Sequence, residues 1–316
     1  MYDSSNLVQL ALTELKINQK QLSVELAVST GQVSRWKNHN DYMSHELYEK
    51  LIKLCGLGTT PPTLALMTGS IANGKKWEEV IRLCAKNAEE DNATGYACYP
   101  LTDLDDWDVL YSISKVLSDL GVMFPTEVPV QINEFLNKGD LDDETWDQLY
   151  SLEHVDLISK IFSVFTDLIG FHSAYIEELS NHDDLFELTD DIQSDYLHLA
   201  ACKVEISSKF APELETHGVK WIRQYKQKLV ELKAGAVEAK VPLREELLSL
   251  VVDDVRDISL AAERQSLGFN DSNLHPDVYM NELLQGMRII HQVLPVILEK
   301  LGIEEIQLDE SELLNG

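Results

Sequence analysis

Apolar residues recur at steps of three and four positions along most of this 316-residue chain, with polar residues between them. This is the period at which an α-helix presents one face, and no convincing strand-like alternation is found. The longest pattern carries two apolar stripes, which are Val155, Ile158, Phe162, Phe165, Ile169, His172, Ile176 and Leu179, and then Ile161, Val164, Leu168, Phe171 and Tyr175. A helix with two apolar faces is expected at the centre of a fold. The pattern therefore predicts an all-α protein.

The order of these patterns predicts a small N-terminal domain followed by a larger helical body, built as a bundle or an irregular helical repeat. Four to five short helices are expected over residues 1–57. Residues 58–76 contain two adjacent prolines and lack a sustained helical period, which predicts a linker. A bundle of long helices is expected over residues 154–301, and the acidic tail 302–316 is expected to fray.

Three tryptophans, Trp77, Trp107 and Trp146, each stand next to an acid and ahead of an apolar pair within residues 77–153. Because the helix dipole favours acids in the first turn, each tryptophan is predicted to lie at a helix start. Such starts would suit the stacked helical pairs of a repeat protein. Their unequal spacing fits a chance similarity of helix starts equally well.

The segment Asn18–Asn38 predicts two short helices joined by a tight turn. Asn18 followed by Gln21, and Ser29 followed by Gln32, have the spacing of the capping box that begins a helix. The expected buried positions are Leu22, Val24 and Leu26 in the first helix and Val33 and Trp36 in the second. The outward positions of the second helix are then Thr30, Gly31, Gln32, Ser34, Arg35 and Lys37.

This outward face is polar, and no acid occurs between Leu26 and Asn40. Arginine and glutamine side chains make paired hydrogen bonds to base edges in the DNA major groove, and helix N-termini offer backbone donors to phosphate oxygens. The spacing alone fits the solvated face of an ordinary helical bundle equally well.

The run from Ile17 to Asn40 resembles the helix-turn-helix of the lambda-repressor-like (Xre/Cro) family, on the following residues in order: Gln19, Leu22, Val28, Ser29, Val33, Ser34, Arg35, Trp36 and Asn38. The resemblance covers roughly the first 57 residues, and the helical body is not recognised. It implies that Leu7–Leu15 form the first helix of the domain and that Ser44–Leu54 form the closing helix. It also implies base contacts by Thr30, Gly31, Gln32 and Arg35, and phosphate contacts by Gln19, Ser29, Lys37 and Asn38.

Three residues depart from the family pattern. Ser23 stands where the family prefers alanine, Lys37 where it often has an acid, and His39 where it often has glycine. None of these changes is expected to break the fold, but those at Lys37 and His39 bear on the turn and on the set of contacts.

Charge is distributed unevenly along the chain. The formal net charge is −28, yet residues 1–57 contain six acids and six bases, so the remaining residues hold 48 acids against 20 bases. A neutral DNA-binding domain on an acidic body should have low non-specific affinity, because the phosphate backbone repels the body. Dimerisation, which places two recognition helices on one DNA site, is the expected remedy.

The last apolar stripe is the candidate dimer seam, because a terminal helix is free to pair with its copy. It consists of Leu283, Met287, Ile290, Leu294, Ile297 and Leu301, and Pro295 is expected to kink it. Such stripes also form intramolecular cores, so both roles stay open.

Candidate catalytic and metal-binding patterns are weak. His154, His172 and the run His182–Asp184, with Asp253 and Asp254, superficially resemble the ligands of helical HD-type phosphohydrolases, but a capped loop explains the run better. The pairs Glu177–Glu178 and Glu245–Glu246 lack partner carboxylates at helical spacing, which favours a solvated face. The four cysteines show no metal-binding spacing. We therefore expect no enzyme activity, no metal and no cofactor.

The sequence as a whole predicts a cytoplasmic, dimeric, sequence-specific transcription regulator that binds a pseudo-palindromic stretch of double-stranded DNA. No signal peptide and no membrane span are expected. The alternative is an interaction protein whose helical body is the working part and binds a peptide, small-molecule or protein effector. A mimic of DNA, based on the acidic surface, and a metal-dependent hydrolase are weaker hypotheses.

Overall fold

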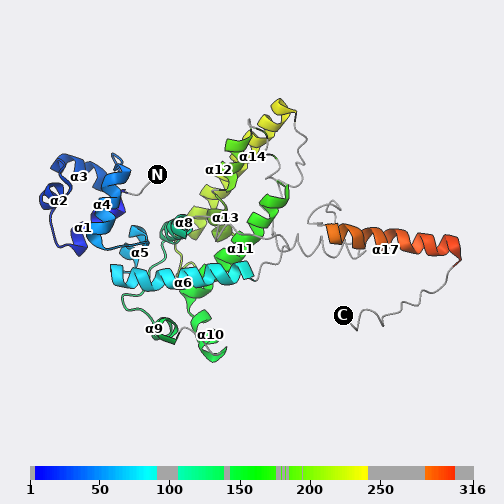
Figure 1. The fold of residues 1–316 in the computed structure, drawn as a ribbon, viewed down its shortest axis with the longest axis horizontal. Helices are drawn as coiled ribbons and strands as arrows, with labels where there is room; N and C mark the ends of the chain where they lie inside the picture. Colours follow the sequence, from blue (N-terminus) through cyan, green and yellow to red (C-terminus); the bar gives the residue numbers. More distant parts are fainter. Residues whose placement is uncertain are drawn as a thin grey trace. The chain divides into compact units, whose positions relative to one another are not determined.

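The computed structural model describes residues 4–90, 106–138, 143–175, 179, 182, 185–193, 195–240 and 282–302. Within these residues the regular elements are helical and no strand occurs, which confirms the all-α prediction (Figure 1). The α-helices are α1 (Ser4–Glu14), α2 (Gln19–Leu26), α3 (Thr30–Lys37), α4 (His45–Cys55), α5 (Pro62–Met67), α6 (Ile71–Glu90), α8 (Asp106–Asp119), α9 (Val130–Lys138), α10 (Asp143–Tyr150), α11 (Glu153–Tyr175), α12 (Phe186–Gln193), α13 (Tyr196–Cys202), α14 (Leu214–Ala239) and α17 (Glu282–Leu301). The chain divides into two compact units, Met1–Leu243 and Arg244–Gly316.

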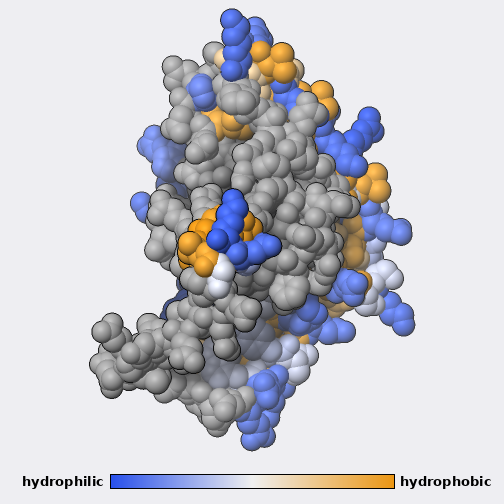
Figure 2. Space-filling model, turned by 90° about the vertical axis from the view of Figure 1, so that its right-hand side faces the viewer, coloured by the Kyte–Doolittle hydropathy of each residue, from blue (hydrophilic) through white to orange (hydrophobic). Residues whose placement is uncertain are grey.

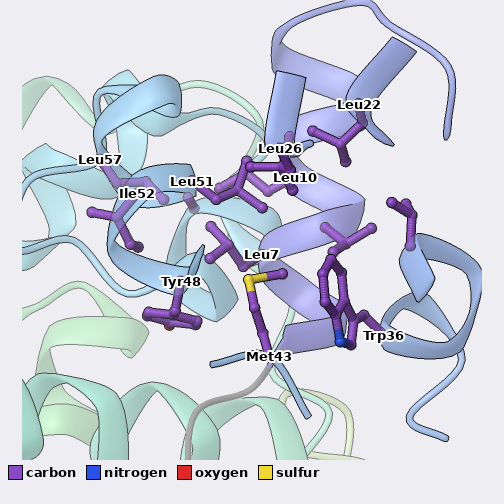
Figure 3. Packing of buried hydrophobic residues seen from close by; sticks show 14 residues of the cluster. Leu7, Leu10, Leu22, Leu26, Trp36, Met43, Tyr48, Leu51, Ile52 and Leu57 are labelled. Atoms are coloured by element: carbon purple, nitrogen blue, oxygen red, sulfur yellow. The ribbon is translucent and has the colours of Figure 1, made fainter. Parts of the chain in front are cut away.

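Helices α1 to α4 enclose one apolar cluster (Figure 3). Its fully or almost fully buried members come from all four helices and are Leu7, Leu10, Leu22, Leu26, Val33, Trp36, Tyr48 and Leu51. Burying a side chain of this size stabilises the fold by about 1.5–3 kcal/mol. The same cluster includes Leu57 and Ala65, so the packing of the N-terminal helices continues into α5 beyond residue 57.

The prediction of a linker over residues 58–76 is wrong, because α5 and the start of α6 occupy this stretch. Pro62 is the first residue of α5, where a missing N–H costs no helical hydrogen bond. Asn6 of α1 donates to Thr63 Oγ1 over 2.9 Å. At Gly74 of α6, an added Cβ would lie 3.1 Å from the Cα of Ala65, so the close approach of α5 and α6 depends on this glycine.

A buried carboxylate holds the loop before α5 against α6. Glu78 is almost fully buried and accepts hydrogen bonds from the hydroxyls of Thr59, at 2.5 Å, and Thr60, at 2.6 Å. Arg82, one turn further along α6, donates to the same carboxylate over 3.0 Å. Three donors offset the cost of removing this charge from water.

Helix α11 is central within the first unit and packs against α6 and α13. Most of its described side chains from both predicted stripes are buried, namely Val155, Ile158, Ile161, Phe162, Phe165, Leu168 and Ile169, while Val164 is half-buried. This confirms the expected central helix as far as Ile169. The side chains of His172, Phe171 and Tyr175, and residue Ile176, lie outside the described part.

The prediction that each tryptophan lies at a helix start is correct for Trp107 and Trp146 but not for Trp77. Trp107 and Trp146 lie in the first turns of α8 and α10. Trp77, however, lies in the second turn of α6, because that helix already begins at Ile71. The side chain of Trp77 has no exposed area and packs against Phe124, with ring centroids 4.8 Å apart. It is therefore a core residue rather than the anchor of a helix start.

Helices α12 and α13 pack along α14, which at 26 residues is the longest described helix (Figure 1). In the face shown in Figure 2, the described surface is mostly hydrophilic with hydrophobic residues between. None of the described helices combines the length and the low charge needed to span a bilayer.

Candidate nucleic-acid interface

The first helix of the candidate interface begins at a complete capping box. Asn18 Oδ1 accepts from the backbone N–H of Gln21 over 3.0 Å, and Gln21 Oε1 accepts from the backbone N–H of Asn18 over 2.9 Å. Both bonds satisfy donors that a helix start otherwise leaves unpaired. Leu22 and Leu26 are buried as predicted, but the predicted burial of Val24 is wrong because its side chain is 73% exposed. Val24 lies on the face of α2 that turns away from the core.

The turn between α2 and α3 is held by backbone and side-chain hydrogen bonds. Ala27 adopts the left-handed conformation, with φ 56°, and ends α2. The backbone N–H of Val28 donates to the Ser23 carbonyl over 2.9 Å. Ser23 is buried, and its hydroxyl lies 3.2 Å from the hydroxyl of Thr30. The serine that departs from the family pattern thus joins the two helices.

Helix α3 is fixed by residues at both ends. Ser29 precedes it and accepts from the backbone N–H of Gln32 over 3.2 Å. Near its other end, Trp36 is buried and donates its indole N–H to the Tyr42 carbonyl over 3.2 Å. The hydroxyl of Ser5 in α1 donates to the Lys37 carbonyl over 2.7 Å. These contacts fix the rotation of α3 about its axis and therefore which side chains face outward.

The residues predicted to contact DNA lie on one stretch of α3 and its flanks. Thr30, Gly31 and Arg35 are exposed, and Gln32 is partly exposed. Among the predicted phosphate contacts, Ser29 and Asn38 are exposed, while Gln19 and Lys37 are partly exposed. The face that carries the base-contact candidates is thus open to solvent, opposite the buried Val33 and Trp36.

Gly31 has no side chain to shield the backbone of α3 on its exposed side. An added Cβ there would meet only Ser29 Oγ, at 3.9 Å, so packing does not require glycine at this position. A bare backbone near a helix N-terminus lets another molecule come close to the helix. A larger side chain at Gly31 would fill the outward space without disturbing the core.

Arg35 does not extend freely into solvent. Its Nε donates to Oδ2 of Asp41 over 3.3 Å, and both side chains are about half exposed. Asp41 also accepts from the backbone N–H of Tyr42 over 2.9 Å through Oδ1. Exposed pairs of this kind contribute at most about 1 kcal/mol, so a phosphate or a base is able to compete for the arginine.

The candidate dimer seam lies on α17, within the second unit. Ile290, Leu294, Ile297 and Leu301 are exposed there, and Val293 and Val296 are exposed beside them. Leu283 and Met287 belong to the same helix, but their side chains lie outside the described part. Pro295 lies inside α17, which runs through it to Leu301.

The residues considered for hydrolase chemistry are not assembled into a described site. His154 packs among Trp77, Phe124 and Phe210 and lies 3.0 Å from the Met123 carbonyl through Nε2, and burial lowers the pKa of its imidazole. His182 is exposed. The remaining candidates lie outside the described side chains: His172, Glu177, Glu178, Asp183, Asp184, Glu245, Glu246, Asp253 and Asp254.

A different group of potential ligands, missed in the sequence, does come together. Asp119, His198 and His217 place one ligand atom each within 4.8 Å of one another. The only local signal is that His217 and Trp221 share a helix face at a spacing of four, which is ordinary for a core. Nothing in the sequence links them to Asp119 or to His198.

Comparison with known proteins provides no relative for this chain. No protein-family model, no curated protein and no solved structure matches it.

Proposed function

We propose that this protein is a sequence-specific transcription regulator of the cytoplasm, in which α2 and α3 act as a helix-turn-helix of the Xre/Cro type. One observation carries the proposal: α3 buries Val33 and Trp36 while a polar side that contains Thr30, Gly31 and Arg35 is exposed. An eight-residue helix held in this way is short enough and polar enough to enter the major groove.

The side chains of α3 and its flanks divide into two roles. Arg35 and Gln32 have the donor geometry for guanine and adenine edges, and Thr30 and Gly31 allow the helix to approach the bases. Gln19, Ser29, Lys37 and Asn38 lie at or near helix ends and are assigned to phosphate oxygens. The N-termini of α2 and α3 would add backbone donors for phosphate oxygens.

Charge explains why the protein would act as a dimer. Residues 1–57 are formally neutral, and the rest of the chain holds 48 of the 54 acids. One neutral domain has few cations with which to displace counterions from DNA, so affinity for a single half-site is low. We assign dimerisation to the exposed apolar side of α17, which includes Ile290, Leu294 and Ile297. Two domains would then bind the half-sites of a pseudo-palindromic operator.

The test is a selection from random double-stranded DNA with the full chain at moderate salt. We expect a consensus with two related half-sites. Arg35→Ala should relax the preference at one position of each half-site and cost about 1–3 kcal/mol, or roughly 5- to 150-fold in affinity. The matched control is Lys86→Ala, which removes one exposed positive charge in α6 and should leave the consensus unchanged. A selection that returns no consensus would exclude this function.

A further inference from the structure

We propose that Asp119, His198 and His217 bind a divalent transition-metal ion, for which Zn²⁺ is the best match. The three residues come from three elements that converge in the first unit: the last residue of α8, the middle of α13 and the first turn of α14. Their ligand atoms already lie within 4.8 Å of one another. Two imidazoles and a carboxylate form a ligand set that proteins use for zinc and related metals.

The backbone around the site fixes the approach of α8 to α14. Gly121 follows α8 with φ +72°, and a Cβ there would lie 3.1 Å from Cγ of Pro212. The backbone N–H of Glu213 donates to the Leu120 carbonyl over 3.1 Å. These contacts fix the end of α8 beside the start of α14. Asp119 is therefore brought to the two histidines by rigid elements rather than by a loose loop.

Both histidines are nearly buried and each has a ring nitrogen without a partner among the described residues. The side chains of His198 and His217 are 7% and 4% exposed, and the unpaired atoms are Nδ1 of His198 and Nε2 of His217. A buried polar atom left without a hydrogen bond destabilises the folded protein. A metal ion bound to both nitrogens would remove that cost.

The two rings are held in fixed orientations. The ring of His217 packs beside the rings of His198 and Trp221, with centroids 5.3 Å and 5.9 Å away. The ring of His198 stacks on Trp221, with centroids 3.6 Å apart and planes 8° from parallel.

The charges near the site come from one acid and two bases. Desolvation and neighbouring charges lower the pKa of His198 to about 3, and desolvation also lowers the pKa of His217. Lys115 pairs with Asp119 over 3.6 Å, and Lys220 lies over the Trp221 ring. Both ammonium groups oppose a cation, but both side chains are exposed and therefore screened by solvent.

Metal binding requires a small contraction of the site. Bonds of about 2.0–2.1 Å in a tetrahedral arrangement put ligand atoms about 3.3 Å apart. Asp119 is the mobile member, because its side chain is 29% exposed while both histidines are packed. On binding, the Asp119 carboxylate would leave its ion pair with Lys115 and bind the metal instead. Three protein ligands leave a fourth position for water or for a small effector.

The test uses the full chain, freed of metal with a chelator and titrated with Zn²⁺ by calorimetry against a competing chelator. We expect one Zn²⁺ per chain, and an affinity at least about tenfold lower in His217→Gln and in Asp119→Asn. The control is His182→Gln, which changes an exposed histidine away from the site. The proposal is overturned if no one-to-one binding occurs or if Asp119→Asn binds as tightly as the wild type.

A second variant separates metal binding from a purely structural role. Lys115→Gln removes the ammonium group that lies 3.6 Å from Asp119, and we expect it to raise the Zn²⁺ affinity severalfold. If Asp119, His198 and His217 served packing alone, removing the Lys115 ammonium group would not raise the Zn²⁺ affinity. An unchanged Zn²⁺ affinity in Lys115→Gln therefore counts against the site. Circular dichroism of each variant checks that it is folded. No DNA is present, so the outcome is independent of the proposed DNA binding.

Discussion

Arg35 and Asp41 form an ion pair on the exposed side of α3, with the guanidinium Nε 3.3 Å from Oδ2. The pair joins the proposed base-contacting arginine to an acid that lies six residues further along. Because both groups are solvent-exposed, the pair orients the arginine without adding much to stability. It also places a negative charge beside the surface that is proposed to meet phosphates.

Asp41→Asn should therefore strengthen DNA binding. The substitution removes the charge that holds Arg35 and repels phosphate, while the amide oxygen still accepts from the Tyr42 N–H. We expect a several-fold gain in affinity, most marked at low salt, with stability changed by no more than about 0.5 kcal/mol. Fluorescence anisotropy with the selected operator measures the gain. An affinity that falls would show that Asp41 positions Arg35 productively.

Glycine substitutions at two residues in left-handed conformations should raise the free energy of unfolding. Ala27 and His39 both have φ 56°, and His39 stands where the resembled family often has glycine. A side chain in this region costs about 1–2 kcal/mol, partly offset by the greater freedom of glycine in the unfolded chain. Ala27→Gly and His39→Gly should each raise the free energy of unfolding by about 0.5–1 kcal/mol in urea titrations. Ala72→Gly, within α6, should lower it by a similar amount.

The buried Glu78 carboxylate, which accepts from Thr60, should contribute far more to the free energy of unfolding than an exposed residue beside it. Glu78→Ala leaves two buried or half-buried threonine hydroxyls and Arg82 without this carboxylate. We expect the free energy of unfolding to fall by about 3 kcal/mol. Glu79→Ala, at the next and exposed position, should change it by less than about 0.5 kcal/mol. Equal urea midpoints for the two variants would contradict the buried network.

Two cysteines should react slowly with alkylating agents because burial disfavours the thiolate. Desolvation raises the pKa of Cys55 and of Cys84 to about 11, from an ordinary value of 9.0. Below the pKa the thiol is protonated, so the rate should rise about tenfold for each pH unit between 7 and 10. At pH 8, both cysteines should react about 100-fold more slowly in the folded protein than in the chain unfolded in urea. Iodoacetamide labelling read by peptide mass spectrometry measures this, and rapid labelling of folded Cys84 would disprove it.

Substitutions on α17 test the proposed dimer seam. Ile290 and Ile297 are 57% and 45% exposed and lie on the same side of the helix. Replacing both by glutamate puts four charges into a paired seam, so the protein should become monomeric and lose affinity for a two-half-site operator. Sedimentation equilibrium gives the oligomeric state, with Glu299→Gln as the control on the same helix. A double variant that stays dimeric would place the seam elsewhere.

Features that depend on neighbours within one or two helical turns could be predicted from the sequence. The helical period, the capping bonds of Asn18 and Ser29, and the outward position of Arg35 all follow from local spacing, since helix hydrogen bonds and caps join residues three or four apart. The formal neutrality of residues 1–57 also follows from composition alone.

Which apolar residues form the core, and which distant polar residues meet, depends on how the helices pack against one another. Trp77 of α6 is a core residue although it was predicted to lie at a helix start, and Val24 is exposed although it fits the apolar stripe of its helix. Burial depends on which elements pack alongside. Residues 62–67 form α5, which packs against α1 and α6. Asp119 meets His217 only because α8 and α14 converge at Gly121, a contact between segments far apart in the chain that no local pattern records.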